Sequence, residues 1–140
     1  MRSLTVPLII LNLQDDGFHL LVEIVVFGQR GYAVLDTGAS RSVFDKTLLE
    51  KHLVHLESHE EAQAATIFST SSTLQGCIPE IRIGQLHLKD YPVVGLDLQG
   101  ISDTYQQLGH PPVIAIIGGD ILMRFRAKID YHKAIVRFYR

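Results

Sequence analysis

The feature that most constrains this sequence is an apolar run at residues 33–35 that ends in Asp36-Thr37-Gly38. Such a run predicts a buried strand, and a carboxylate at its end is costly to desolvate unless it serves a purpose. The glycine predicts a tight turn directly afterwards. The chain has nine aspartates but only one Asp-Thr-Gly and no Asp-Ser-Gly. Chemistry that needs two carboxylates from this element must therefore take the second one from elsewhere.

The remaining pattern is mostly that of a β protein. Short runs rich in Val, Ile and Leu are separated by turn signals such as Asp15-Asp16-Gly17. Three antiparallel strands are expected before Asp36, and alternating segments flank a turn at residues 84–85. The expected strands are residues 8–13, 20–27, 32–35, 64–68, 74–78, 93–98, 113–117, 127–131 and 134–139.

Helices are expected at two places. Ser42-x-x-Asp45 resembles a capping box, and apolar residues at helical spacing follow it, so a helix is predicted over residues 43–53. A second short helix is predicted over residues 120–125, with the carboxylate of Asp120 near its positive end. Residues 99–112 are predicted to be irregular.

Length, charge and cysteine content limit the classes of protein to which this chain can belong. At 140 residues the chain is one domain, and a net charge of −2 with a pI near 6.4 gives no electrostatic footprint for nucleic acid. No run approaches the roughly 18 apolar residues of a membrane span. A single cysteine, Cys77, favours a reducing compartment and predicts a cytoplasmic protein. The sequence leaves open whether a targeting segment has been removed.

A second element, at residues 113–122, is an apolar strand that runs into Gly118-Gly119. Residues 35–40 together with Ile116-Ile117-Gly118 resemble the paired motifs of pepsin-type aspartic proteases. More narrowly, they resemble the single-domain, retroviral-like (retropepsin-type) proteases and their bacterial relatives. The tripeptide alone is weak evidence, whereas both elements in this order are specific. The resemblance implies a mainly β, closed barrel-like fold with a flap hairpin and one or two short helices over residues 1–140.

The resemblance implies an aspartic endopeptidase that cleaves a polypeptide substrate without metal or organic cofactor. Hydrolysis of this kind needs a water polarised between an acid and a base. Two carboxylates about 3 Å apart cannot both ionise, so they share one proton and fill both roles. Because Asp36 is the only candidate, the second carboxylate is expected to be Asp36 of another copy. The expected active species is a homodimer.

The resemblance also gives roles to neighbouring residues. Thr37 and Gly38 support the catalytic carboxylate, while Ile117 and Gly118 support its loop from behind. Substrate is bound around Asp36 and by a Ser/Thr-rich tip where the family places its flap, which implies contacts from Ala39, Ser40, Ile116, Ser69, Thr70, Ser71, Ser72 and Thr73. Alanine at position 39, as in retroviral-type enzymes, predicts an activity optimum nearer about pH 5–6 than about pH 2–3.

The sequence departs from the family pattern at two places. The flap tip lacks the paired glycines of retroviral enzymes and the tyrosine of pepsin. Arg41 and Asp120 stand where retroviral enzymes carry charges of the opposite arrangement, so the two residues are hypothesised to form a structural ion pair.

Two other readings stay open. The unusual flap tip is compatible with a catalytically silent domain of the same fold that binds peptides as a scaffold. His52, His55 and His59 fall close to one face of the predicted helix and could hold a metal, although a solvated helix face is favoured and no metal site is expected.

Overall fold

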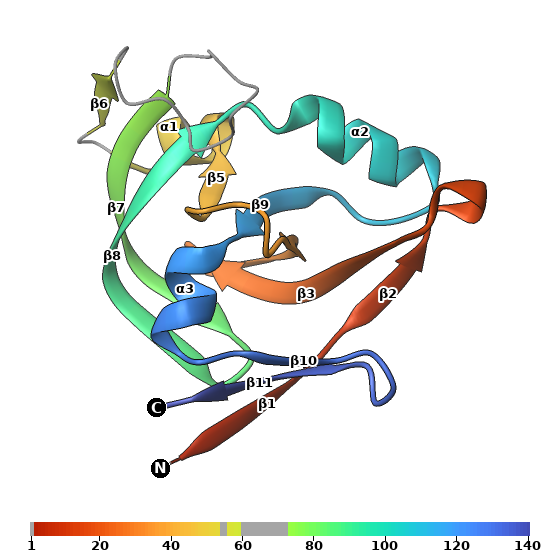
Figure 1. Cartoon of the computed structure of the whole chain (residues 1–140). Coiled ribbons are helices and arrows are strands. Elements are labelled where there is room, and N and C mark those ends of the chain that lie inside the picture. Colours follow the sequence, from red (N-terminus) through yellow and green to blue (C-terminus); the bar gives the residue numbers. More distant parts are fainter. Residues whose placement is uncertain (1, 54–55, 60–72) are drawn as a thin grey trace.

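A computed structural model describes residues 2–53, 56–59 and 73–140. Most of the described residues lie in strands (Figure 1). The strands are β1 (Ser3–Pro7), β2 (Ile9–Asn12), β3 (Phe18–Val26), β4 (Gln29–Leu35), β5 (Val43–Asp45), β6 (Glu57–His59), β7 (Thr73–Ile83), β8 (Leu86–Leu96), β9 (Val113–Ile117), β10 (Lys128–Asp130) and β11 (Ile135–Tyr139). The helices are α1 (Lys46–His52), α2 (Gln99–Gln107) and α3 (Gly119–Arg124), with one 3-10 turn, η1 (Gln14–Asp16).

The larger sheet closes on itself as a barrel. Its strand order is β2-β3-β4-β9-β5-β8-β7-β6, and a further pairing of β3 with β7 joins the two sides, so that six strands form the closed wall. Most neighbours are antiparallel, but β4 runs parallel to β9 and β5 runs parallel to β8. The mainly β, barrel-like fold predicted from the sequence is confirmed.

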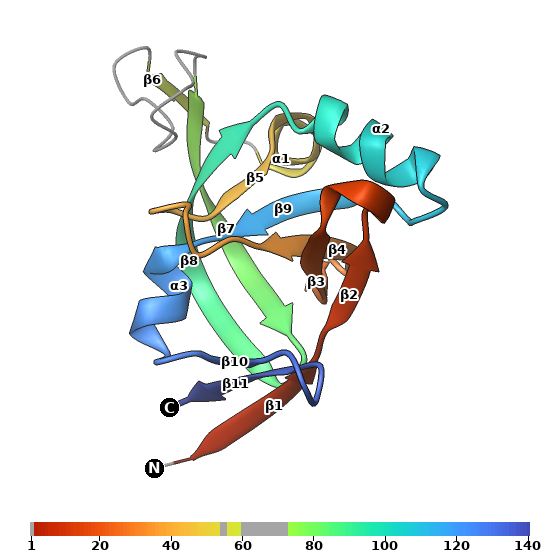
Figure 2. The ribbon, with the colours of Figure 1, turned by 45° about the vertical axis from the view of Figure 1, so that its right-hand side comes forward.

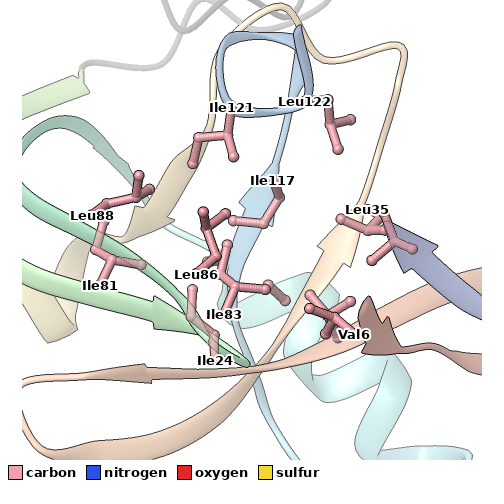
Figure 3. Close-up of a cluster of buried hydrophobic side chains, with 14 of the residues drawn as sticks. Val6, Ile24, Leu35, Ile81, Ile83, Leu86, Leu88, Ile117, Ile121 and Leu122 are labelled. Atoms are coloured by element: carbon pink, nitrogen blue, oxygen red, sulfur yellow. The ribbon is translucent and has the colours of Figure 1, made fainter. Parts of the chain in front are cut away.

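Alternation of apolar and polar residues explains the barrel interior. Along β7 and β8, Ile81, Ile83, Leu86 and Leu88 are buried while the residues between them face solvent. These side chains meet Ile24 of the neighbouring strand β3 and Ile117 of β9, in the cluster shown in Figure 3. Leu35, directly before the Asp36 turn, belongs to the same cluster. The residue preceding the turn is thereby anchored in the core.

A smaller, three-stranded sheet lies below the barrel in Figure 2, in the order β1-β11-β10. The first and last strands of the chain pair along their whole length, from Ser3 opposite Tyr139 to Pro7 opposite Ile135. Alternate residues on this sheet, such as Val6, Val136 and Phe138, are buried in the main core. The opposite face carries Thr5, Arg137 and Lys128, which face one another across the three strands.

The position of β9 between β4 and β5 determines the geometry of the site. Leu35 lies opposite Ile117 in the parallel β4–β9 ladder, and Val43 lies opposite Ile116 in the antiparallel β5–β9 ladder. The segment from Asp36 to Ser42 therefore leaves one neighbour of β9 and returns to β9 on its other side. The two elements singled out in the sequence meet side by side.

The prediction of three antiparallel strands before Asp36 is confirmed by β2, β3 and β4. The start of the predicted helix at residue 43 is wrong. Val43 and Phe44 are buried and pair with β8 and β9 as a strand, so α1 begins only at Lys46. The apolar residues of segment 43–53 therefore belong first to a buried strand, β5, and then to one short helix, α1.

Residues 99–112 were expected to be irregular, and this is wrong for the helix α2. Its inner side places Ser102 and Tyr105 in the core, and the Gln99 side-chain amide donates to the Asp103 carboxylate at 2.7 Å. Its N-cap residue, Leu98, is apolar and makes no side-chain cap hydrogen bond. The predicted strand at residues 64–68 lies outside the described residues.

Candidate active site

Asp36 is the first residue after β4, and its loop is held by three hydrogen bonds. The backbone N–H of Asp36 donates to the carbonyl of Ile117 at 3.0 Å, which continues the β4–β9 ladder by one residue. The N–H of Gly38 donates to Asp36 Oδ1 at 2.9 Å, and the N–H of Ala39 donates to the Asp36 carbonyl at 3.1 Å. The carboxylate is thus fixed at a rigid strand end, while Asp36, Thr37 and Gly38 are exposed.

Close backbone approach holds the start of α3 against the Asp36 loop. The N–H of Gly119 donates to the Ala39 carbonyl at 2.7 Å, and that of Asp120 donates to the Ser40 carbonyl at 3.1 Å. A Cβ added to Gly118 would lie 2.6 Å from the Ala39 oxygen and 2.9 Å from the Arg41 carbonyl. Real side chains do not approach so closely, so only glycine fits where the two motifs cross.

The carboxylate of Asp120 is the centre of a polar network behind the loop. Asp120 Oδ1 accepts hydrogen bonds from the Ser42 N–H at 2.8 Å and the Ser42 hydroxyl at 2.7 Å, and Oδ2 accepts from the Tyr91 hydroxyl at 3.1 Å. Ser42 is buried, and its Oγ also accepts from the Gly118 N–H at 2.9 Å. The hydrogen bonds of Ser42 therefore join the end of the Asp36 loop to the start of α3.

Asp120 does not use the partner hypothesised from the sequence. Within the described part of the chain, no salt bridge joins Arg41 to Asp120, and Arg41 is exposed. The carboxylate instead faces Ser42, which the sequence pattern assigned to a helix cap, and Tyr91, which it did not single out. Burial, followed by the charge of Asp120, raises the pKa of Tyr91 to about 12, so this phenol remains a hydrogen-bond donor.

A hollow of about 290 Å³ opens beside Asp36. It is lined by residues of β3, the β4 end and the β10–β11 turn region, namely Phe18, His19, Leu20, Leu35, Asp36, Thr37, Ile129 and Tyr131. Asp36 is the only acidic residue among these lining residues of the described chain. The hollow is open to solvent and offers a single carboxylate.

His19 and Tyr105 are two further neighbours of this hollow that the sequence reasoning missed. The Tyr105 hydroxyl is hydrogen-bonded to His19 Nδ1, and Tyr105 is buried in a cluster with Leu21 and Val34. Burial and then the negative charge of Asp36 raise the pKa of Tyr105. Helix α2 therefore reaches the neighbourhood of Asp36, and no sequence motif signals it.

The other predicted site residues are divided between the site and segments that are not described. Ile116 is half-buried and packs against Val43 and Val94 on one side and Leu21 and Val34 on the other. Ile117 is fully buried in the main core. Ala39 is buried and Ser40 exposed at the crossing with α3. The predicted flap residues Ser69, Thr70, Ser71 and Ser72 lie outside the described residues, and Thr73 begins β7.

The structure places two of the three histidines considered as metal ligands on different elements. His52 ends α1 and its ring stacks on Phe27 at 4.5 Å, whereas His59 belongs to strand β6. His55 lies outside the described residues. The prediction of a shared helix face is therefore wrong for His52 and His59. No group of three metal-ligating side chains occurs within residues 2–53, 56–59 and 73–140. Cys77 lies exposed on β7.

The sequence profile described as aspartyl protease matches residues 22–121, which include both motifs and the network around Asp120. The chain belongs to the aspartyl protease family. No curated protein matches it. Within the described residues, no helix has both the length and the apolar character needed to cross a membrane.

Two solved structures are similar to this chain, and the first of them shows its fold. A retropepsin-like aspartic protease from Rickettsia conorii superimposes with a TM-score of 0.57 at 22% identity, covering 99% of this chain and 95% of that one. The retroviral protease-like domain of Ddi1 from Leishmania major gives a TM-score of 0.49 at 17% identity, covering 81% of this chain and 82% of that domain. The first likeness shows that this chain has a retropepsin-like fold.

Proposed function

We propose that this protein is an aspartic endopeptidase that is active as a homodimer, with one catalytic Asp36 from each subunit. The observation that carries the proposal is the placement of Asp36. A rigid loop holds its carboxylate at the edge of an open hollow, and no second acid lines that hollow in the described chain. Each subunit therefore provides one carboxylate of a two-carboxylate centre, and the partner subunit, related by a two-fold axis beside Asp36, provides the other.

In the dimer, the paired carboxylates share a proton because two like charges about 3 Å apart cannot both ionise. The ionised carboxylate takes a proton from a water molecule that attacks the scissile carbonyl. The protonated one donates to the carbonyl oxygen as the tetrahedral intermediate forms. Hydrogen bonding from the Gly38 N–H to Asp36 Oδ1 fixes the carboxylate, so little reorganisation accompanies this transfer.

Further roles follow for the residues around the dyad. Thr37 is exposed next to Asp36, and in the proposed dimer its hydroxyl bonds with the equivalent loop of the partner subunit. Ala39, Ser40 and Ile116 contribute to substrate binding around the dyad, and residues 69–73 serve as the flap over an extended polypeptide. Ser42, Asp120 and Tyr91 act indirectly, because their network fixes the loop that carries Asp36.

The test compares two aspartates that make the same local hydrogen bond. Asp97 Oδ1 accepts the Gln99 N–H at 3.0 Å, as Asp36 Oδ1 accepts the Gly38 N–H at 2.9 Å, but Asp97 does not line the hollow beside Asp36. On denatured casein or a peptide library, Asp36→Asn should lower cleavage about 10²–10⁴-fold and Asp97→Asn should leave it unchanged. A pepstatin-type inhibitor should stop the wild-type reaction.

Two outcomes oppose the proposal. Equal cleavage by wild type and Asp36→Asn would remove Asp36 as the catalytic group. Peptide binding with no turnover by either protein would favour the silent scaffold domain instead.

A further inference from the structure

We infer that a cationic surface at one end of the small sheet binds an acidic segment of the polypeptide substrate, outside the hollow that holds Asp36. This surface, the cationic patch, consists of Arg124, Arg126, Lys128, Arg137 and Arg140. The assignment rests on the proposed endopeptidase function and adds to it the class of substrate that this protein recruits.

Basic residues are concentrated in residues 124–140 of the sequence. This segment contains six of the thirteen lysines and arginines but only one of the fifteen acidic residues, Asp130. The whole chain carries a net charge of −2, so the excess of positive charge is local. A surface that gathers charge of one sign attracts a ligand of the opposite sign.

The fold brings these basic residues together around Tyr139. A hollow of about 280 Å³ is lined by Arg124, Phe125, Arg126, Tyr139 and Arg140. Three of its five lining residues are therefore arginines, and an aromatic ring lies on either side of them in the sequence. The planar guanidinium group of arginine matches the geometry of a carboxylate and binds it through two N–H groups.

Tyr139 connects this hollow with the polar face of the small sheet. The Lys128 Nζ lies 5.3 Å from the centroid of the Tyr139 ring. Hydrogen bonding from Arg137 lowers the pKa of the Tyr139 phenol, and the positive charge of Lys128 acts in the same direction. A phenol whose anion is favoured in this way lies in a region of positive potential.

Several of these positive charges are not neutralised within the subunit. Lys128 lies directly opposite Arg137 in the β10–β11 ladder. Like charges at directly facing positions destabilise antiparallel strands. Among the described residues, Arg124, Lys128 and Arg137 form no salt bridge, and Arg137 Nε has no hydrogen-bond partner. A ligand that places carboxylates over this pair of strands removes the repulsion.

Arg124 is held in an orientation that suits a carboxylate ligand. Its guanidinium carbon lies 5.1 Å from the centroid of the Phe125 ring and 6.0 Å from that of the Tyr91 ring. Contact with aromatic faces fixes a guanidinium group and leaves its N–H edge available for hydrogen bonds. Little side-chain freedom is then lost when the ligand binds.

The cationic patch is separate from the hollow beside Asp36. Ile129 lines that hollow, and neighbouring residues of a strand point to opposite faces, so Lys128 points away from it. Tyr131, which also lines the hollow, is three residues from Lys128, and an extended chain covers about 10 Å over this span. A substrate that occupies both places therefore carries its acidic segment several residues from the scissile bond.

An acidic polypeptide segment is the anion that agrees best with the rest of the molecule. The proposed active site acts on polypeptides, so an acidic segment of the same substrate reaches the patch at a high effective concentration. Nucleic acid is disfavoured, because its binding depends on many phosphate contacts and this protein is negatively charged overall.

Peptide binding to Asp36→Asn protein tests the patch independently of catalysis. Fluorescence anisotropy should show saturable binding of a labelled peptide of about six glutamates, weakening as salt is added, and no binding of the matching glutamine peptide. Lys128→Glu and Arg140→Glu should each raise the Kd of the glutamate peptide about ten-fold. Lys89→Glu, the same change of charge on an exposed residue of β8, should change that Kd less than about two-fold.

Lys128→Glu provides its own folding control. A glutamate at this position faces Arg137 with opposite charge, so the urea midpoint of the variant should be equal to or above that of wild type. Loss of peptide binding in a variant of that stability does not come from unfolding.

In the active enzyme the effect should appear in KM. A cleavable peptide joined to the glutamate segment by a Gly/Ser linker of about twelve residues should have a KM about ten-fold lower than its glutamine counterpart, at equal kcat. A linker of about two residues spans at most about 7 Å and should give no such gain. Lys128→Glu should remove the gain seen with the long linker.

Three results would overturn the inference even if Asp36 is catalytic. They are equal binding of the glutamate peptide by wild type, Lys128→Glu and Arg140→Glu; binding to phosphatidylserine vesicles with none to the peptide; and an equal gain in KM with the short linker. Peptide binding that depends on Lys128 and Arg140, in a protein that never cleaves peptides, would instead support the cationic patch and refute the proposed activity.

Discussion

Replacing Gly118 with alanine tests whether the crossing of the two motifs builds the site. Gly118 has φ −110° and ψ −165°, a backbone conformation open to any residue, so backbone strain does not explain the glycine. The constraint is space. A Cβ would meet the Ala39 oxygen at 2.6 Å and both the Arg41 carbonyl carbon and oxygen at 2.9 Å, all of them backbone atoms that cannot rotate away.

The expected loss follows from these contacts. Forcing one methyl group into a packed site costs about 1–3 kcal/mol. The shift that relieves the clash also lengthens the Gly118 N–H bond to Ser42 Oγ and the Gly119 N–H bond to the Ala39 carbonyl, each worth about 1 kcal/mol. We expect Gly118→Ala to lose about 3 kcal/mol of unfolding free energy, and cleavage to fall about 10²-fold because a displacement of about 1 Å misplaces Asp36.

Gly119→Ala is the matched control. Its Cβ would lie 3.5 Å from the nearest atoms, the Ala39 and Ser40 oxygens, and position 119 is the first residue of α3, where alanine favours the helix. Urea unfolding followed by far-UV circular dichroism, at one fixed protein concentration, measures both variants, and Gly119→Ala should stay within about 0.5 kcal/mol of wild type. Equal losses in the two variants, or a stable and active Gly118→Ala, would refute the reasoning.

Three further predictions concern the network around Asp120. Ser42→Ala leaves the buried Gly118 N–H without its acceptor and should cost about 1–3 kcal/mol in the same urea assay; no measurable loss would contradict the network. Asp120→Asn keeps the side-chain shape but places N–H groups where a carboxylate oxygen accepted hydrogen bonds, so a loss of about 1–3 kcal/mol of unfolding free energy is expected. A variant as stable as wild type would contradict the network. Burial and then the charge of Asp120 raise the pKa of Tyr91 from 10.0 to about 12, so its contribution to stability is full below pH 10 and is lost as pH rises towards 12. Tyr91→Phe should abolish that part of the pH dependence of the unfolding free energy, and an unchanged pH dependence would contradict the role of Tyr91 in the network.

The strand pattern could be predicted because its signals are local. Alternation along residues 81–88 and the apolar run at 113–117 each encode a strand directly. The pairing of β4 with β9 connects residues about 80 positions apart, and it was expected only through the family resemblance. Asp36 itself was identifiable because an acidic residue at the end of an apolar run is unusual.

The rest of the site arises from tertiary contacts that local patterns do not encode. Ser42-x-x-Asp45 has the form of a helix cap, but the Ser42 hydroxyl bonds Asp120, and Asp45 Oδ1 accepts the Leu98 N–H at 3.1 Å. A charged residue in each motif suggested an ion pair of Arg41 with Asp120, yet hydroxyl and N–H donors of Ser42 and Tyr91 satisfy the carboxylate instead. Tyr91, from β8, and Tyr105, from α2, reach the site only through folding.

The account depends on each polypeptide providing half of the catalytic centre. The most direct measurement is the cleavage rate per subunit as the enzyme is diluted through its dimer Kd, together with titration of wild type by Asp36→Asn protein. The account predicts that the rate per subunit falls on dilution and that the inactive variant suppresses wild-type activity by forming mixed dimers. A constant rate per subunit in protein shown to be monomeric, with no suppression by the variant, would contradict it.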